Sequence, residues 1–343
     1  MVSTTPFNAT QGGAGPADLV AEVEALGERL SLVRDRIGEI IFGQREVVEQ
    51  ALITLLSGGH GLLIGVPGLA KTRLVETLGT TLGLADKRIQ CTPDLMPADI
   101  LGSEVLEESE TGRRSFRFIR GPVFCQLLMA DEINRASPRT QSALLQAMQE
   151  GRVSIAGQYH PLPQPFHVLA TQNPLEQEGT YQLPEAQLDR FMLKLNIGYP
   201  TKVEERKILD LMGTSAPDLS VQNVASPEEI IRSRDIVNRI FIDERVKDYI
   251  VDIVWATRRP KDYNLGMDGL IRYGASPRAT INLTLAARAH AFLNGRGYVT
   301  PHDIKSIGPD VLRHRVIVSY EAEAEEVTSE TIIQRIFSGL AVP

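Results

Sequence analysis

Residues 65–72 form a short loop of mostly small residues that ends in a lysine and a threonine. The loop consists of Gly65, Val66, Pro67, Gly68, Leu69, Ala70, Lys71 and Thr72. An apolar run precedes it and an amphipathic segment follows it, so backbone N–H groups and a helix N-terminus should meet at one point. Such a point binds phosphate, with Lys71 on the β- and γ-phosphates of ATP and the Thr72 hydroxyl on Mg²⁺.

Two residues of this loop depart from ordinary patterns. Glycine usually stands directly before the lysine, whereas this chain has Ala70, which loosens the match slightly. Lys71 falls in the first turn of the expected helix, where a cation opposes the helix dipole. A bound anion explains such a residue more readily than folding does. The alternative is an ordinary glycine turn, which the strand–loop–helix context disfavours.

Polar residues also end two later apolar runs, 124–131 and 167–172, which are separated from the loop by the run 87–92. Asp131 and Glu132 end one run, and ligands bind at the carboxyl ends of strands in open parallel sheets. We expect Asp131 to hold Mg²⁺, directly or through water, and Glu132 to orient and polarise the attacking water. Asn173 ends the following run and could bind that water or the γ-phosphate. An Asn-Pro turn is its alternative, and the order of the motifs favours the catalytic role.

Short apolar runs alternate with helical segments between residues 61 and 198. The runs are 61–65, 87–92, 124–131, 167–172 and 190–198. This alternation predicts an α/β fold with a parallel five-stranded sheet covered by helices on both faces. Two stretches, 93–122 and 151–165, interrupt the rhythm and are interpreted as insertions. The second alternates polar and apolar residues as a hairpin does.

The ends of the chain differ from this α/β part. Residues 1–17 are predicted to be disordered, and an apolar stripe between Leu19 and Ile40 predicts a helix packed on its own domain rather than a coiled coil. Beyond residue 200, Ser and Thr caps followed by acidic residues indicate a mainly helical domain. We therefore expect an α/β domain at 18–200 and a helical domain at 201–343.

Composition narrows the class of protein. The 343-residue chain has a net charge of −7 and a pI near 5.5, which disfavours a broad nucleic-acid-binding face. Its only cysteines, Cys91 and Cys125, fit a reducing cytosol without structural zinc. The N-terminus shows no signal peptide. No run is apolar and long enough to span a membrane.

The order of these motifs resembles the AAA+ superfamily and, within it, the MoxR family. The matching stretches are 41–44, 65–72, 91–102, 130–135, 183–191 and 274–279. Together they cover roughly residues 40 to 315. The segments Thr92–Pro97 and Leu183–Phe191 make the resemblance specific, because a phosphate loop alone occurs in many families. The resemblance implies a P-loop AAA+ core with a C-terminal all-α lid.

The resemblance also implies further site residues. Gly43 and Gln44 match the segment that contacts adenine, and Asn173 matches the sensor 1 position. Arg190 matches an arginine finger that completes the neighbouring subunit's site, with an intramolecular salt bridge as its alternative. Arg278 matches sensor 2 on the lid, which implies a role in both catalysis and nucleotide binding. The two insertions match segments that face the pore or the substrate in related proteins.

The function implied is that of a cytoplasmic ATP hydrolase that forms a hexameric ring and remodels a partner protein. The family suggests maturation of metalloenzymes or assembly of complexes, often with an adaptor that carries a von Willebrand factor A domain. A DNA-acting motor and a chelatase-like subunit that drives metal insertion are the alternatives, together with a binding module without turnover. Arg113, Arg114, Arg117 and Arg120 form a small basic cluster in the first insertion, interpreted as a partner or subunit contact.

Overall fold

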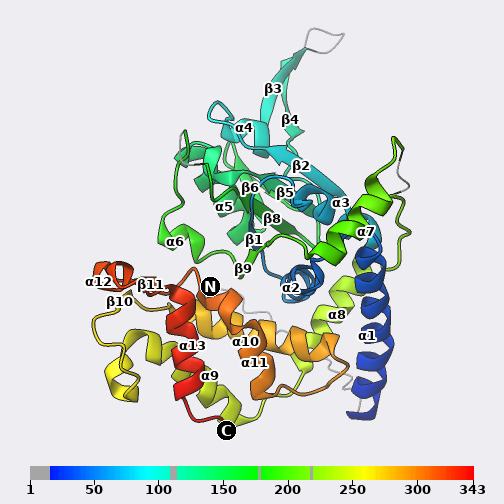
Figure 1. The fold of residues 1–343 in the computed structure, drawn as a ribbon. Coiled ribbons are helices and arrows are strands. Elements are labelled where there is room, and N and C mark those ends of the chain that lie inside the picture. Colours follow the sequence, from blue (N-terminus) through cyan, green and yellow to red (C-terminus); the bar gives the residue numbers. More distant parts are fainter. Residues whose placement is uncertain (1–15, 109–113, 177–178, 217–218) are drawn as a thin grey trace, which may run out of the picture.

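The computed structural model describes residues 16–108, 114–176, 179–216 and 219–343 (Figure 1). The segment predicted to be disordered therefore lies outside the described residues as far as residue 15. Its last two residues, Pro16 and Ala17, instead begin helix α1 (Pro16–Gly38). Arg113 of the basic cluster also lies outside the described residues.

Five parallel strands form the central sheet. They are β1 (Gly61–Ile64), β2 (Asp86–Gln90), β5 (Leu127–Asp131), β8 (His167–Gln172) and β9 (Leu193–Asn196). Their order across the sheet is β2-β5-β8-β1-β9, and every pairing is parallel. The predicted sheet is confirmed. Its strands are shorter than the apolar runs because flanking residues such as Phe124 and Phe191 are buried in loops instead.

The two stretches interpreted as insertions, 93–122 and 151–165, each contain an antiparallel hairpin. The first holds α4 (Pro97–Leu101), β3 (Gly102–Glu108) and β4 (Arg114–Arg120), and its hairpin projects well beyond the sheet (Figure 1). The second consists of β6 (Arg152–Ile155) and β7 (Gln158–Pro161), as the alternation predicted. The hairpins meet where Phe118 stacks on His160, with ring centroids 4.1 Å apart.

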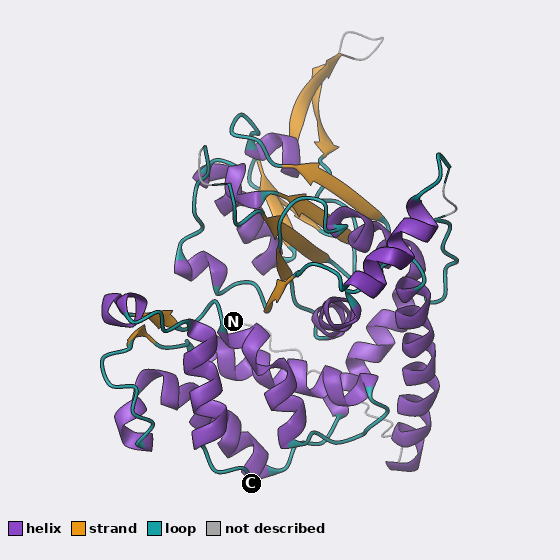
Figure 2. Cartoon of the chain, viewed as in Figure 1, coloured by secondary structure: helices purple, strands orange, loops and turns teal. Residues whose placement is uncertain are grey.

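Helices cover the sheet and continue into the C-terminal part (Figure 2). Those of the α/β part are α2 (Arg45–Leu56), α3 (Lys71–Thr81), the 3-10 turn η1 (Ile133–Arg135), α5 (Pro138–Glu150) and the short α6 (Glu185–Leu188). The apolar stripe of α1 contacts α2, α3 and the later helices α8 and α10 of the same chain. Val23, Leu30 and Val33 of that stripe are buried, so α1 packs on its own chain as expected.

The described residues of the C-terminal part are mainly helical and include one small ladder. Its helices are α7 (Lys202–Met212), α8 (Pro227–Arg239), α9 (Glu244–Arg258), η2 (Pro260–Tyr263), α10 (Pro277–Leu293), α11 (Pro301–Leu312), α12 (Tyr320–Ala324) and α13 (Ser329–Gly339). Strands β10 (Ile271–Tyr273) and β11 (Ile317–Val318) pair antiparallel. The lid expected to be all-α therefore carries a two-stranded ladder as well. None of the helices described is long and apolar enough to cross a membrane.

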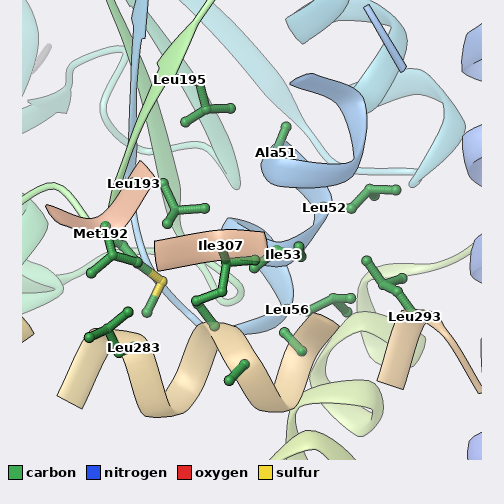
Figure 3. Packing of buried hydrophobic residues seen from close by; sticks show 14 of the residues in the cluster. Ala51, Leu52, Ile53, Leu56, Met192, Leu193, Leu195, Leu283, Leu293 and Ile307 are labelled. Carbon is green, nitrogen blue, oxygen red and sulfur yellow. The ribbon is translucent and has the colours of Figure 1, made fainter. Parts of the chain in front are cut away.

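The lid shares a hydrophobic core with one face of the sheet. Met192 and Leu193 at the start of β9 lie against α10 and α11, where Leu283 and Ile307 are buried (Figure 3). The opposite face of the sheet packs on α5 in a separate cluster that includes Leu128 and Ala170. Buried apolar area is the main source of folding stability, so the lid is fixed to the α/β part around β9.

Candidate nucleotide-binding and catalytic site

The phosphate loop lies between β1 and α3 and lines a cleft of about 530 Å³. The lining residues are Pro67, Gly68, Leu69, Ala70, Lys71, Thr72, Arg73, Glu76, Asp131 and Glu132. The fold thus brings the loop and the acidic pair, 60 positions apart in the sequence, into one cavity. Parallel pairing explains this, because the carboxyl ends of β1 and β5 lie on the same edge of the sheet.

The backbone of this loop is strained at Ala70. Ala70 has φ 56° and ψ 24°, in the left-handed region, and directly precedes helix α3. Gly68 also has a positive φ, of 86°, which costs glycine nothing. For alanine the left-handed conformation costs roughly 1–2 kcal/mol. The unusual alanine found in the sequence therefore occupies a position whose geometry favours glycine.

Lys71 lies in the first turn of α3 with its ammonium group turned back onto the loop. Its Nζ donates hydrogen bonds to the carbonyl oxygens of Gly65 and, at 3.3 Å, Val66. Partial burial lowers the pKa of Lys71, while the negative charges of Asp131 and Glu132 oppose that shift. A phosphate group in the cleft would offer this ammonium a charged acceptor in place of neutral carbonyls.

Asp131 is almost fully buried and has both carboxylate oxygens occupied. Its Oδ1 accepts a hydrogen bond from the Thr171 hydroxyl at 2.6 Å, and its Oδ2 pairs with Arg88 of β2 at 2.6 Å. Hard oxygen donors such as this carboxylate and the Thr72 hydroxyl suit Mg²⁺, which usually takes one or two carboxylates together with substrate phosphates. Both residues line the same cleft, so the donor set fits Mg²⁺ bound together with a nucleotide.

Glu132 turns sharply away from the strand, with φ 53° and ψ 52°. Its backbone N–H donates to the Thr171 hydroxyl at 2.8 Å, which holds this turn in place. Its Oε2 accepts hydrogen bonds from Gln90 at 2.9 Å and Arg135 at 3.1 Å. Within the described residues Oε1 has no partner, so this oxygen remains able to bind a water molecule.

Asn173 lies at the end of β8, between the carboxyl ends of β5 and β1. The side chain is 4% exposed, and its Oδ1 accepts a hydrogen bond from the backbone of Leu175 at 3.1 Å. This bond is the local Asn-Pro turn given above as the alternative. The position is therefore the expected one, and the sensor role of Asn173 stays a prediction.

A second hollow of about 330 Å³ adjoins the phosphate cleft and shares Gly68, Leu69, Ala70 and Arg73 with it. Its other walls are Ile40, Ile41, Phe42, Gln44, Pro200, Ile208, Met212 and Leu219. An apolar hollow next to a phosphate site suits a nucleobase.

Gln44 and Gly43, predicted at the adenine, both belong to this region. The Gln44 Nε2 donates to the Gly198 carbonyl at 2.9 Å. Gly43 has a positive φ of 72°, and a Cβ there would come within 2.9 Å of a Glu204 carboxylate oxygen.

Sequence reasoning missed the contribution of α7 to this hollow. Ile208 and Met212 are spaced by one helical turn and line the hollow, yet α7 buries none of its residues completely. The available signal in the sequence was the helical spacing of apolar residues such as Ile208 and Met212, which predicts an apolar face on this helix. Within α7, Ile208 and Met212 are the residues that line this hollow.

Arg190 and Arg278 lie elsewhere. Arg190 follows α6, on the other side of the sheet from α3 and α7 (Figure 1). It is half-buried, and its guanidinium makes no hydrogen bond or ion pair with any described residue. Its neighbour Asp189 pairs instead with Arg278 at 3.3 Å and Arg315 at 2.7 Å. The salt-bridge alternative for Arg190 is therefore not formed, and Arg278 is not among the residues that line the phosphate cleft.

Comparisons with known proteins agree with this arrangement. A profile described as "ATPase family associated with various cellular activities (AAA)" matches residues 60–193, and one for an AAA lid domain matches residues 267–336. A candidate ATPase from Cytophaga hutchinsonii, known from a crystal structure, superimposes with a TM-score of 0.88 at 42% identity. The match covers 95% of this chain and 98% of that one. Fold and site thus define an ATPase of the AAA class.

Relatives narrow the class to one family. The chain is 44% identical to "Chaperone MoxR1" of Mycobacterium tuberculosis over 99% of this chain and 88% of that protein. It is 30% identical to "Protein MoxR" of Methylorubrum extorquens over 90% of this chain and 93% of that protein. The chain belongs to the MoxR family of AAA+ ATPases.

Proposed function

We propose that this protein hydrolyses ATP with Mg²⁺ and works as a ring of identical subunits, expected to be hexameric. One observation carries the proposal. The phosphate loop, Asp131 and Glu132 line a single cleft at the carboxyl ends of the strands. Arg190 instead lies between α6 and the start of β9, at the opposite edge of the sheet, and its guanidinium has no partner among the described residues. A cation needed for phosphate chemistry but remote from its own cleft fits a site that a neighbouring subunit completes.

Each residue of the cleft has a defined task in this proposal. Lys71 binds the phosphates, and Thr72 and Asp131 hold Mg²⁺, which neutralises phosphate charge. Glu132 orients a water through its free Oε1. The water oxygen bonds to the γ-phosphorus and passes a proton to the Glu132 carboxylate, while the bond from that phosphorus to the leaving oxygen of ADP breaks, giving ADP and phosphate. Asn173 assists the water, and Gln44 with Gly43 borders the base.

We propose further that hydrolysis remodels a protein client, in metalloenzyme maturation or complex assembly. A relative named as a chaperone supports a protein client, and an adaptor with a von Willebrand factor A domain would select it. The projecting β3–β4 hairpin exposes Leu106 and Phe116, which stand opposite each other in the ladder. Exposed apolar side chains on a projecting hairpin suit a protein surface.

The same hairpin disfavours a DNA-acting motor. Arg114 pairs with Glu108 at 3.2 Å and Arg117 pairs with Glu107 at 2.9 Å, across the two strands. These glutamates offset the positive charge that a phosphate backbone would need. Two arginines of the basic cluster, Arg114 and Arg117, are therefore balanced by glutamates of the facing strand.

Mixed rings test the proposal. Lys71→Ala should lose ATP binding but still carry Arg190 for the neighbouring site. Arg190→Ala should bind ATP but lose turnover. Neither variant alone should hydrolyse ATP. Mixed and co-assembled, they should recover a fraction of the wild-type rate, because some interfaces pair an intact cleft with an intact finger. An arginine finger supplies on the order of 10³ or more in rate, so recovery should stand far above background.

Native mass spectrometry would establish that both variants occupy one ring. Mixed rings without any recovery would mean that Arg190 acts within its own subunit or has a structural role. A fluorescent ATP analogue that binds Lys71→Ala as tightly as wild type would instead remove the phosphate-binding role of Lys71.

A further inference from the structure

Asp189, directly before Arg190, connects the α/β part to two separate segments of the lid. Its carboxylate accepts hydrogen bonds from the Ser276 hydroxyl at 2.9 Å and from Arg278 at 3.3 Å, both at the start of α10. It also pairs with Arg315, just beyond α11, at 2.7 Å. Three donors from the lid therefore converge on one carboxylate in the turn between α6 and β9.

Arg315 holds the backbone on both sides of Arg190. Its side chain is 1% exposed. One of its nitrogens donates to the carbonyl oxygens of Asp189 at 3.0 Å and Phe191 at 2.6 Å. Another donates to the carbonyl of Met192 at 3.1 Å. The peptide carbonyls that flank Arg190 are thus fixed by a single guanidinium from the lid.

The charge balance of this cluster leaves Arg190 without a partner. Asp189 is the carboxylate adjacent to Arg190 in sequence, and Arg278 and Arg315 both compete for it. Arg315 is buried and needs the charge of Asp189, because an uncompensated buried cation is strongly destabilising. Asp189 is therefore committed to the lid arginines, and Arg190 stays available for an anion brought from outside the chain.

We propose that Asp189 is a positioning residue that sets the Arg190 finger and couples it to the lid. This inference rests on the proposed function, in which Arg190 completes the neighbouring site. Any displacement of α10 or α11 would be transmitted through Ser276 and Arg315 to the turn that carries Arg190. A misplacement of about 1 Å in a catalytic group can cost about 100-fold in rate, so a displacement of that size passed on to Arg190 would be enough to lower turnover.

Asp189→Asn provides the test, because the amide keeps the shape of the side chain and removes its charge. We expect ATP affinity within about twofold of wild type, since the cleft lies at the opposite edge of the sheet, and kcat lowered about 10- to 100-fold. Asp210→Asn is the matched control, because Asp210 is an exposed carboxylate paired with Arg206 at 3.0 Å. That control should leave both quantities unchanged.

Complementation in mixed rings separates positioning from general damage. Asp189→Asn has an intact cleft, so mixing it with Lys71→Ala should restore activity. Mixing it with Arg190→Ala should not, because both variants lack a working finger. If activity recovers in the mixture with Lys71→Ala but not in the mixture with Arg190→Ala, Asp189 acts on the same side of the subunit interface as Arg190. Native mass spectrometry and thermal melting would verify that Asp189→Asn folds and enters rings.

Each remaining outcome has a definite meaning. If Lys71→Ala and Arg190→Ala fail to complement each other, the proposed ring mechanism fails. If that pair recovers and Asp189→Asn with Lys71→Ala does not, only the positioning role is overturned. Wild-type kcat in Asp189→Asn would overturn it as well. Should Asp189→Asn not fold, Ser276→Ala, which removes one donor without changing charge, should lower kcat by a smaller factor with unchanged ATP affinity.

Discussion

Two arginine–aspartate pairs of almost equal length differ sharply in their surroundings. Arg88 and Asp131 in the phosphate cleft are 2.6 Å apart, and the Arg88 side chain is 48% exposed. Arg315 and Asp189 at the junction of lid and sheet are 2.7 Å apart, and the Arg315 side chain is 1% exposed. Distance alone would rank the two pairs as equals, whereas solvent exposure separates them.

The difference indicates which contacts can rearrange. The Arg88 side chain is half exposed and can return to water when it leaves Asp131, whereas the buried Asp131 needs a cation in its place, which Mg²⁺ would supply. Arg315 has backbone carbonyls and a carboxylate as acceptors in a buried position, and breaking that set would leave an uncompensated charge. The cleft is therefore suited to exchange partners when nucleotide and metal bind, while the junction holds its geometry.

The largest expected effect on the cleft comes from Glu132→Gln. The amide keeps the shape of the side chain but cannot polarise water, so turnover should fall roughly 10²- to 10³-fold while ATP binding persists. Steady-state hydrolysis and a fluorescent ATP analogue would measure the two quantities. Glu176→Gln is the matched control, because Glu176 lies 3.9 Å from the same Arg135 and has no assigned catalytic task.

A wild-type rate in Glu132→Gln would show that another residue activates the water. Loss of ATP binding in this variant would point to a structural role for the carboxylate in shaping the cleft. Either result would contradict the proposed role of Glu132, in which the carboxylate acts on a water molecule after ATP has bound.

A smaller effect is expected from Arg88→Gln. The Arg88 guanidinium pairs with the Asp131 carboxylate, at which Mg²⁺ is also expected. Removing the charge of Arg88 should therefore strengthen metal binding. We expect the Mg²⁺ concentration that half-saturates ATP binding to fall by roughly three- to tenfold, the lower end applying if solvent screens the charge. Titration of Mg²⁺ at fixed ATP analogue would measure this shift.

Arg152→Gln is a suitable comparison, since Arg152 forms a similar exposed pair with Glu150 at 3.2 Å away from the cleft. A higher Mg²⁺ requirement in Arg88→Gln would contradict the expectation. It would mean that Arg88 moves onto the phosphates rather than competing with the metal.

The sequence was informative wherever a short stretch determines the structure. The alternation of apolar runs predicted the parallel sheet, and the residue spacing of 65–72 predicted the loop whose lysine and threonine line the cleft. Asp131 and Glu132 were found because they end a buried strand on the same edge. In each case local periodicity and parallel pairing were sufficient.

Partners that are distant in sequence escaped this reasoning. Arg88 meets Asp131 across 43 positions, and Arg315 meets Asp189 across 126. For Arg190 the sequence left a salt bridge open as the alternative to the finger role, and it could not show that the lid arginines hold Asp189. Which of several nearby charges pair depends on tertiary packing, and no local spacing encodes that choice.

The smallest expected effect concerns the strain at Ala70. Ala70→Gly should relieve a left-handed alanine, worth roughly 1–2 kcal/mol, while glycine adds freedom to the unfolded chain that costs about 0.4–1 kcal/mol. The net expectation is a free energy of unfolding raised by about 0–1.6 kcal/mol, measured by denaturant melts. Ala156→Gly is the matched control, because Ala156 has φ 47° in the β6–β7 turn. If relief of backbone strain is the only effect on stability, both variants should become more stable by a similar amount. Only Ala70→Gly should change ATP affinity, because Ala70 lines the cleft and Ala156 does not. A free energy of unfolding lowered by 1 kcal/mol or more in Ala70→Gly would contradict this expectation, because it is the effect of a glycine placed in an ordinary helix. It would mean that Ala70 is not strained in the loop. The loop backbone, like the lid junction, would then have a stable conformation without a ligand.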